Sequence, residues 1–320
     1  EQDSRHHAIA SKVPMLEPAS SQECKDYAML AFELSEKYDT PVLLRLSTRI
    51  SHSRSPVTIG NRNDVPLRGY KKDPQKHVMM PAMARARHLF VEERTEKLRE
   101  YAETSGINKT KYNSDAIGII CAGTTYNYAK EAMGKNARYL KLGMVNPLPV
   151  KLIKDFASKV KRLVVIEELD DIIETHCLKN GIPCEGKNLF PVCGEFSQSI
   201  VRKALTGEDS YVSVDCELPP RPPVLCAGCP HRGLFYALKD MKLFVSGDIG
   251  CYTLAAQAPL AMIDTCVCMG ASVSGLHGFN IARGRDGAKN SVAVIGDSTF
   301  CHSGVTGLMD IAYNQGISTV

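Results

Sequence analysis

The stretch that decides the fold is Val292-Ala293-Val294-Ile295-Gly296-Asp297-Ser298-Thr299-Phe300, which precedes a segment of helical character over residues 302–314. Its wholly apolar first half is typical of a strand buried on both faces of a parallel sheet. The Gly-Asp-Ser that follows then lies at the carboxyl edge of the sheet, where α/β proteins bind ligands, and the next helix N-terminus suits a diphosphate. Asp297 could hold Mg²⁺ there, or it could only cap the helix.

Strands and helices alternate upstream of this stretch. The pattern of residues 116–121 predicts a strand that leads into a helix, and residues 163–166 predict a further strand. Residues 20–38 predict a helix that starts with a Ser20/Glu23 capping box. This alternation predicts an α/β protein with several doubly wound, mostly parallel sheets.

The composition excludes several classes of function. Lys plus Arg total 39 and Asp plus Glu total 35, so the formal net charge is +4 with both signs scattered, which argues against nucleic-acid binding. No apolar run approaches the roughly 18–20 residues of a membrane span, and no signal-peptide pattern opens the sequence. We therefore expect a cytoplasmic protein with no nucleic-acid or membrane partner.

Cysteine is unusually frequent, with 12 residues in 320. In a reducing compartment such thiols are reduced, metal-bound or catalytic more often than paired in disulfides. Cys226 and Cys229 form a C-x-x-C loop before Pro230-His231, and Cys251 follows a predicted strand, so we expect the three sulfurs to lie close together. An iron–sulfur cluster, Zn²⁺, dithiol redox chemistry and plain structural thiols all remain open from the spacing.

A second cysteine pair, Cys266-Val267-Cys268, precedes Met269-Gly270. A C-x-C spacing can supply two metal ligands, but it also arises where buried thiols alternate along a strand. We expect buried thiols at a strand end for this pair.

Six motifs together resemble one enzyme family. They are Glu1-Gln2-Asp3, TRISHS at 48–53, CAGCPHRG at 226–233, GDIGCYTL at 247–254, CMGASVSGLHGF at 268–279 and GDSTFCHSG at 296–304. The set resembles the alpha (large) subunits of indolepyruvate ferredoxin oxidoreductases, within the thiamine diphosphate-dependent 2-oxoacid:ferredoxin oxidoreductases. The resemblance covers essentially the whole chain.

The resemblance also implies a domain order. Residues 1–55 would be the C-terminal part of a pyrimidine-binding thiamine domain, 56–112 a linker with a peripheral helix, 113–215 a transketolase C-terminal-like domain, and 216–320 the N-terminal part of a diphosphate-binding thiamine domain. Because residues 317–320 have the pattern of a strand cut midway, we expect a fragment that lacks both ends. The pyrimidine-side glutamate and the second Mg²⁺ ligand of the family would lie outside it.

Site residues follow from the same resemblance. Asp297 would bind the Mg²⁺ of thiamine diphosphate, and Cys226, Cys229 and Cys251 resemble ligands of a 4Fe–4S cluster whose fourth ligand is open among Cys266, Cys268 and Cys301 or is lost. Further clusters would lie in a C-terminal domain absent here. Residues expected at the cofactor are Gly247, Asp248, Gly250, Gly270, Ala271, Gly296, Ser298 and Thr299, and the candidates on the substrate side are Arg49, His52 and His231. As isolated residues, Arg49 and His52 would more often be surface groups, and His231 could face the diphosphate or the substrate, or be a hydrogen-bonded structural histidine.

The implied reaction is the oxidative decarboxylation of an aryl 2-oxo acid to an aryl-acetyl-CoA, with ferredoxin as electron acceptor. Coenzyme A, ferredoxin and a smaller beta subunit are then the expected partners. Two alternatives remain from the sequence. A non-redox thiamine diphosphate decarboxylase would keep Asp297 without using the cysteines, and a non-catalytic Zn-binding protein would use Cys226 and Cys229 without needing the Gly-Asp-Ser.

Overall fold

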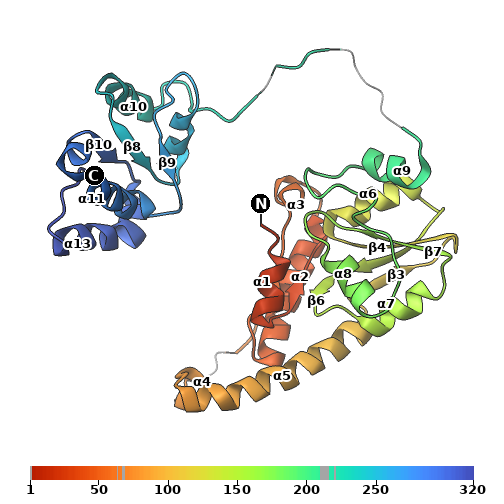
Figure 1. Ribbon diagram of the computed structural model, residues 1–320. Coiled ribbons are helices and arrows are strands. Elements are labelled where there is room, and N and C mark those ends of the chain that lie inside the picture. Colours follow the sequence, from red (N-terminus) through yellow and green to blue (C-terminus); the bar gives the residue numbers. More distant parts are fainter. Residues whose placement is uncertain (1, 63, 67–68, 210–215, 220) are drawn as a thin grey trace. The chain divides into compact units, whose positions relative to one another are not determined.

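The computed structural model describes residues 2–62, 64–66, 69–209, 216–219 and 221–320, and its chain divides into two units, 1–213 and 214–320 (Figure 1). Both units contain parallel β-strands with helices packed against them. In the part of the chain that is described, no helix is both long enough and apolar enough to cross a membrane. Glu1 of the first motif, and residues 210–215 at a predicted segment boundary, lie outside the described residues.

The larger sheet of the first unit has the strand order β3-β5-β4-β7. Its strands are β3 (Lys109–Lys111), β4 (Ile117–Ala122), β5 (Arg138–Leu142) and β7 (Arg162–Ile166), and only β3 is antiparallel to its neighbour. Neighbouring residues of β4 enter opposite cores, because Ile119 packs with α6 (Gly123–Met133) and α9 (Gln198–Thr206), whereas Ile120 packs with α7 (Val150–Ala157) and α8 (Ile172–Lys179). Helices therefore cover both faces, and the prediction of a doubly wound, mostly parallel sheet is confirmed.

A smaller sheet of the first unit places β1 (Met15–Leu16) between β2 (Leu43–Leu44) and β6 (Met144–Asn146). The helices of this region are α1 (Arg5–Ser11), α2 (Ser21–Tyr38), α3 (Thr48–His52), α4 (Pro74–His77) and α5 (Pro81–Thr104). Leu34 of α2 and Ala102 of α5 share one apolar cluster with this sheet. The predicted cap of α2 is confirmed, since the Glu23 N–H donates to Ser20 Oγ at 3.2 Å.

A buried group of charges ties the N-terminal segment to the larger sheet. The Arg5 guanidinium donates to both carboxylate oxygens of Asp3, at 3.0 Å from Nε and 2.6 Å from Nη2, and to Glu167. Glu167 also accepts hydrogen bonds from the first N–H groups of α8, at Ile173 and Glu174. These bonds fix the loop after β7 beside the N-terminal segment, and Asp3 is also ion-paired to Arg45, with 3.9 Å between Oδ1 and Nη2.

The second unit contains the parallel sheet β10-β8-β9. Its elements are α10 (His231–Asp240), β8 (Phe244–Gly247), η1 (Cys251–Ala256), β9 (Thr265–Cys266), α11 (Ala271–Lys289), β10 (Ser291–Ala293), α12 (Asp297–Thr299), the π-helical η2 (Phe300–Gly304) and α13 (Val305–Tyr313). Val245 packs with α10 and η1, whereas Phe244 packs with α11 and α13. This sheet is therefore also covered on both faces.

Two predicted elements differ from the structure at the end of this unit. The helix expected from His302 starts earlier, at Asp297, and continues through η2 into α13. Residues 317–320 do not form the expected strand. The Asn280 side chain donates a hydrogen bond to the Ile317 carbonyl at 3.0 Å. One backbone hydrogen bond joins this segment to β10, from the Ala293 N–H to the Thr319 carbonyl at 2.9 Å.

Candidate functional site

Most of the predicted site residues lie in loops at the carboxyl edge of the β10-β8-β9 sheet. Residues 247–251 follow the body of β8, residues 267–270 follow β9, and residues 294–296 lead from β10 into α12. Since the three strands are parallel, these loops lie at the same edge. That edge is where open α/β sheets hold their ligands.

Asp248 lies at this edge with its side chain fully buried. Its carboxylate accepts hydrogen bonds from the Gly270 N–H, at 3.0 and 2.9 Å, and from the Ser272 N–H at 3.1 Å, and Oδ1 also accepts from the Ile249 N–H at 2.8 Å. Burial alone would raise the pKa of this carboxyl, but the backbone donors outweigh burial and lower the pKa. Both oxygens cap the start of α11, so Asp248 has a structural role inside the protein, and its predicted contact with the cofactor stays a prediction.

Asp297 has the opposite environment. Its side chain is exposed at the first position of α12, and among the described residues its carboxylate accepts one hydrogen bond, from the N–H of its own neighbour Ser298 to Oδ1 at 2.8 Å. In the described part of the chain, no ion pair involves Asp297. Ser298 is exposed beside it, whereas Thr299 is buried. The Asp297 carboxylate thus retains an unpaired oxygen at the sheet edge, which suits a hard cation such as Mg²⁺.

Tyr252 connects the loop after β8 to the loop after β10, and the sequence motifs did not predict this role. Its hydroxyl accepts the Gly296 N–H at 3.0 Å and donates to the Ile249 carbonyl at 3.3 Å. Its ring is 7% exposed and meets the His231 ring edge-on, with 5.7 Å between centroids. The only signal in the sequence is its place in the GDIGCYTL motif, because the Gly296 partner lies 44 residues away.

The glycines of the motifs allow close packing between chain segments. A Cβ on Gly250 would lie 2.4 Å from Tyr252 Cε1, and a Cβ on Gly247 would lie 2.7 Å from Ile263 Cγ2. Gly270 has φ +86°, and a Cβ there would lie 2.5 Å from Ser303 Cβ in η2. Each of these glycines has a structural requirement inside the protein, so the predicted cofactor contacts of Gly247, Gly250 and Gly270 stay predictions.

The C-x-x-C loop closes by a turn in which the Cys229 N–H donates to the Cys226 carbonyl at 3.1 Å. The Arg232 guanidinium braces this loop by donating to the same carbonyl at 3.0 Å. Cys226 and Cys251 are exposed, and Cys229 is half-buried. His231 begins α10 directly after the loop.

No set of three or more His, Cys, Asp or Glu side chains is arranged to hold a metal ion among the described residues. Cys226, Cys229 and Cys251 therefore do not form a ready ligand set, and a cluster on them stays a prediction. The expectation of buried thiols at Cys266 and Cys268 was wrong, because both are exposed. The physical reason is that the two-residue β9 ends at Cys266 on the edge of the sheet, where no further strand covers it.

The substrate-side candidates Arg49 and His52 belong to α3 of the first unit. Arg49 forms a two-point ion pair with Glu195, with Nε–Oε1 and Nη2–Oε2 distances of 2.6 Å each, and this hydrogen bonding raises the pKa of the guanidinium. Arg49 and Glu195 line a cavity of about 350 Å³ together with Arg45 and Glu168. Burial raises the pKa of the Glu168 carboxyl. His52 is exposed at the other end of the helix and is not among the lining residues.

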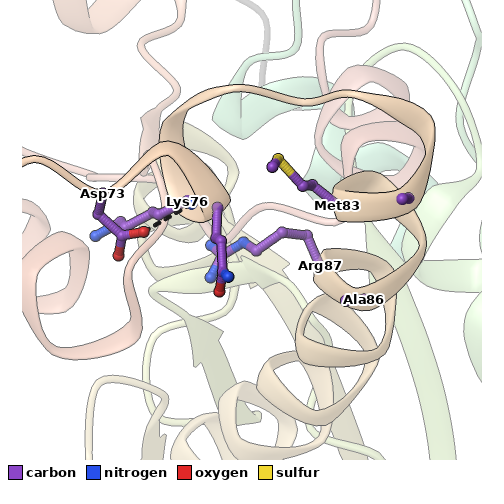
Figure 2. Close-up of a pocket in the computed structure, with 7 residues that line it drawn as sticks. Asp73, Lys76, Met83, Ala86 and Arg87 are labelled. Carbon is purple, nitrogen blue, oxygen red and sulfur yellow. Dashed lines mark hydrogen bonds between the residues drawn. The ribbon is translucent and has the colours of Figure 1, made fainter.

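A cavity of about 480 Å³ lies between α4 and α5 (Figure 2). Lys76 and Arg87 contribute charge to its wall, but each is ion-paired to Asp39, at 2.7 and 2.9 Å. Asp73 also lines the cavity, so two carboxylates balance the two cations and the cavity offers little net attraction for an anion. None of the predicted site residues lines it.

Two family models match the chain. Residues 2–117 match "Pyruvate flavodoxin/ferredoxin oxidoreductase, thiamine diP-bdg", and residues 248–320 match "Thiamine pyrophosphate enzyme, C-terminal TPP binding domain". The second match begins at Asp248, so it contains the Asp of the pair at 247–248 and both residues of the pair at 296–297. It therefore covers the sheet edge described above.

Curated relatives match over nearly the whole chain. The indolepyruvate oxidoreductase subunit IorA of Methanothermobacter thermautotrophicus is 38% identical over 98% of this chain and 55% of its own length. That of Archaeoglobus fulgidus is 37% identical over 98% of this chain and 54% of its own length. The chain thus spans about half the length of these relatives. A solved 2-oxoglutarate:ferredoxin oxidoreductase from Magnetococcus marinus aligns with a TM-score of 0.47 and 16% identity, over 65% of this chain and 45% of that one.

Proposed function

Because this chain belongs to the family of the indolepyruvate oxidoreductase IorA subunits, among the thiamine diphosphate-dependent 2-oxoacid oxidoreductases, we propose that the protein oxidatively decarboxylates aryl 2-oxo acids of the indolepyruvate class. The products would be CO₂ and an aryl-acetyl-CoA, and ferredoxin would accept the electrons. Coenzyme A, ferredoxin and a smaller beta subunit are the proposed partners, and the cytoplasm is the proposed location.

The observation that carries the proposal is the contrast in exposure at the sheet edge of the second unit. Asp297 is the exposed carboxylate of a Gly-Asp-Ser that begins a helix after a parallel strand. Its unpaired oxygen fits the oxygen preference of Mg²⁺, and Mg²⁺ would join it to the diphosphate of the cofactor. Thiamine diphosphate, when bound, supplies the electron sink that decarboxylation needs.

The remaining roles rest on placement and charge. Ser298, exposed next to Asp297, is proposed to contact the diphosphate, and Gly296 and Ala271 to flank it. Thr299 is buried, so its contribution would come through its backbone N–H. In the first unit, Arg49 is proposed to bind the carboxylate of the 2-oxo acid, because a guanidinium matches a carboxylate in two-point geometry, as it does with Glu195.

His52 and His231 are proposed to act on the substrate side as proton donors or acceptors. His231 is the better supported, since its ring meets Tyr252 at the sheet edge. We derive no electron-transfer step through a cluster on Cys226, Cys229 and Cys251, because these side chains form no ligand set among the described residues. The same finding leaves the non-catalytic zinc alternative without a formed site.

The test is an assay of the full-length protein with its partner subunit, in which indolepyruvate and coenzyme A reduce a viologen dye. We expect dye reduction that needs added thiamine diphosphate, Mg²⁺ and coenzyme A together. Release of CO₂ without dye reduction would instead indicate the non-redox decarboxylase. Dye reduction that is independent of thiamine diphosphate would overturn the proposal.

A further inference from the structure

The hydroxyl of Tyr252 joins the loop after β8 to the first residue of the Gly296-Asp297-Ser298 segment. It accepts the Gly296 N–H at 3.0 Å, and the next residue along the chain is Asp297. Gly296 lies outside regular secondary structure, between β10 and α12. The direction of its peptide group is therefore set by this hydrogen bond and by the start of the helix.

The tyrosine is itself held rigidly. Its hydroxyl donates to the Ile249 carbonyl, and its ring leaves no room for a Cβ at Gly250, where the Cβ–Cε1 distance would be 2.4 Å. The edge of the His231 ring meets it at an interplanar angle of 73°. The ring is also part of the apolar cluster that contains Phe235. A side chain that is fixed on several sides can hold the loop that it contacts in one position.

The loop that carries Tyr252 is fixed in turn. Thr253 Oγ1 donates to the Asp248 carbonyl at 2.6 Å and accepts the Gly250 N–H at 3.0 Å. Asp248 is held by its carboxylate at the start of α11. A connected set of hydrogen bonds therefore runs from the start of α11 to the Asp248 carboxylate, from there to the Ile249 N–H, and from the Ile249 carbonyl through the Tyr252 hydroxyl to Gly296.

From these contacts we infer that Tyr252 is a positioning residue for the metal half-site: its hydroxyl fixes Gly296, so that the Asp297 carboxylate is held ready for Mg²⁺ before the cofactor arrives. This inference rests on the proposed function, in which Asp297 binds the Mg²⁺ of thiamine diphosphate. A metal-ligating side chain that is already held in its bound position loses less conformational entropy when the metal binds, which lowers the free-energy cost of binding. Tyr252 itself touches neither the metal nor the substrate in this account.

The variant that tests it is Tyr252→Phe, which keeps the ring and removes only the hydroxyl. Loss of one neutral hydrogen bond to the loop predicts that the Mg²⁺ concentration for half-maximal thiamine diphosphate binding rises about threefold to tenfold. The maximum extent of binding at saturating Mg²⁺ should not change. Titration calorimetry of the full-length protein with its partner subunit, at a series of Mg²⁺ concentrations, measures both.

The matched control is Tyr139→Phe. Tyr139 is a buried tyrosine of β5 whose hydroxyl donates to the Gly134 carbonyl at 2.9 Å, far from the second unit in sequence. Loss of the Tyr139 hydroxyl should lower the unfolding temperature and leave unchanged the Mg²⁺ concentration for half-maximal thiamine diphosphate binding. A merely structural role of Tyr252 predicts the same pattern for both variants.

Three results can be distinguished. A raised Mg²⁺ requirement in Tyr252→Phe alone supports the inference. An unchanged requirement in Tyr252→Phe, or equal shifts in both variants, overturns it while leaving the proposed function in place. Absence of Mg²⁺-dependent cofactor binding in the unmodified protein overturns the proposed function, and this inference with it.

Discussion

Two Gly-Asp pairs follow neighbouring parallel strands of the same sheet, and their carboxylates have opposite environments. Asp248, after β8, is fully buried and accepts backbone N–H groups from Gly270 and Ser272. Asp297, after β10, is exposed, and within the described part of the chain its carboxylate accepts a hydrogen bond from Ser298 N–H alone. One carboxylate has its hydrogen-bond partners inside the fold, and the other has an exposed oxygen with no hydrogen bond from the described residues.

The difference teaches that the strand–Gly–Asp pattern alone does not define a metal ligand. What decides is whether another segment brings N–H donors to the carboxylate. The loop after β9 does so for Asp248, since Gly270 begins α11 with a positive φ and turns its N–H toward β8. No described segment does so for Asp297.

The largest effect is expected when the exposed carboxylate is removed. Asp297→Ala in the full-length protein should lower the affinity for Mg²⁺ and thiamine diphosphate by more than about 100-fold, because loss of a direct ligand costs at least as much as loss of its outer-shell partners. The unfolding temperature should hardly change, since the side chain is exposed. Calorimetry and thermal unfolding check the two statements, and near-normal cofactor affinity would remove Asp297 from the metal site.

The second prediction concerns the buried carboxylate. Asp248→Ala should lower the free energy of unfolding of the second unit by about 2 kcal/mol, because it leaves the N–H groups at the start of α11 without their cap. Chemical denaturation followed by circular dichroism measures the change. Stability equal to that of the unmodified protein would show that the cap contributes nothing.

A smaller effect is expected from pH. The folded-state pKa of Asp248 is lowered from 3.8, so its stabilising contribution is complete above that value and is lost as the pH falls through the folded-state pKa. The unfolding temperature of Asp248→Asn should therefore depend less on pH below about 4 than that of the unmodified protein. Parallel acid titrations of the two proteins decide, and identical pH profiles would contradict the assignment.

The smallest effect is expected at Ser298, which is exposed and whose hydroxyl makes no hydrogen bond among the described residues. Ser298→Gly removes this hydroxyl and keeps a small residue next to Asp297. We expect the cofactor affinity to fall by about threefold to tenfold, because the proposed contact of the hydroxyl with the diphosphate is a single hydrogen bond. An unchanged affinity would show that the hydroxyl makes no such contact.

Much of the fold could be predicted from local patterns. The apolar run at 292–295 and the strand–helix alternation at 116–166 predicted doubly wound parallel sheets, because burial on both faces leaves a continuous apolar signature. The expected strand at 317–320 does not form. The Asn280 side chain of α11 donates a hydrogen bond to the Ile317 carbonyl, a tertiary contact that the local pattern does not reveal.

The sequence predicted only those features of the site that depend on residues close together along the chain. The pattern placed Asp248 and Asp297 after strands, but the donors that distinguish them lie 22 and 24 residues beyond Asp248. The role of Tyr252 could not be predicted, because its hydrogen-bond partner Gly296 lies 44 residues away in the sequence. The exposure of Cys266 and Cys268 depended on where β9 ends, which residue type does not determine.

The most direct test of the central claim compares Asp297→Asn and Asp248→Asn in the full-length protein, with Mn²⁺ as the paramagnetic substitute for Mg²⁺. Electron paramagnetic resonance counts the Mn²⁺ bound in the presence of thiamine diphosphate, at a temperature where both variants remain folded. The account predicts that Asp297→Asn loses the bound Mn²⁺ and that Asp248→Asn retains it. Retention by Asp297→Asn, or loss by a folded Asp248→Asn alone, would contradict the account.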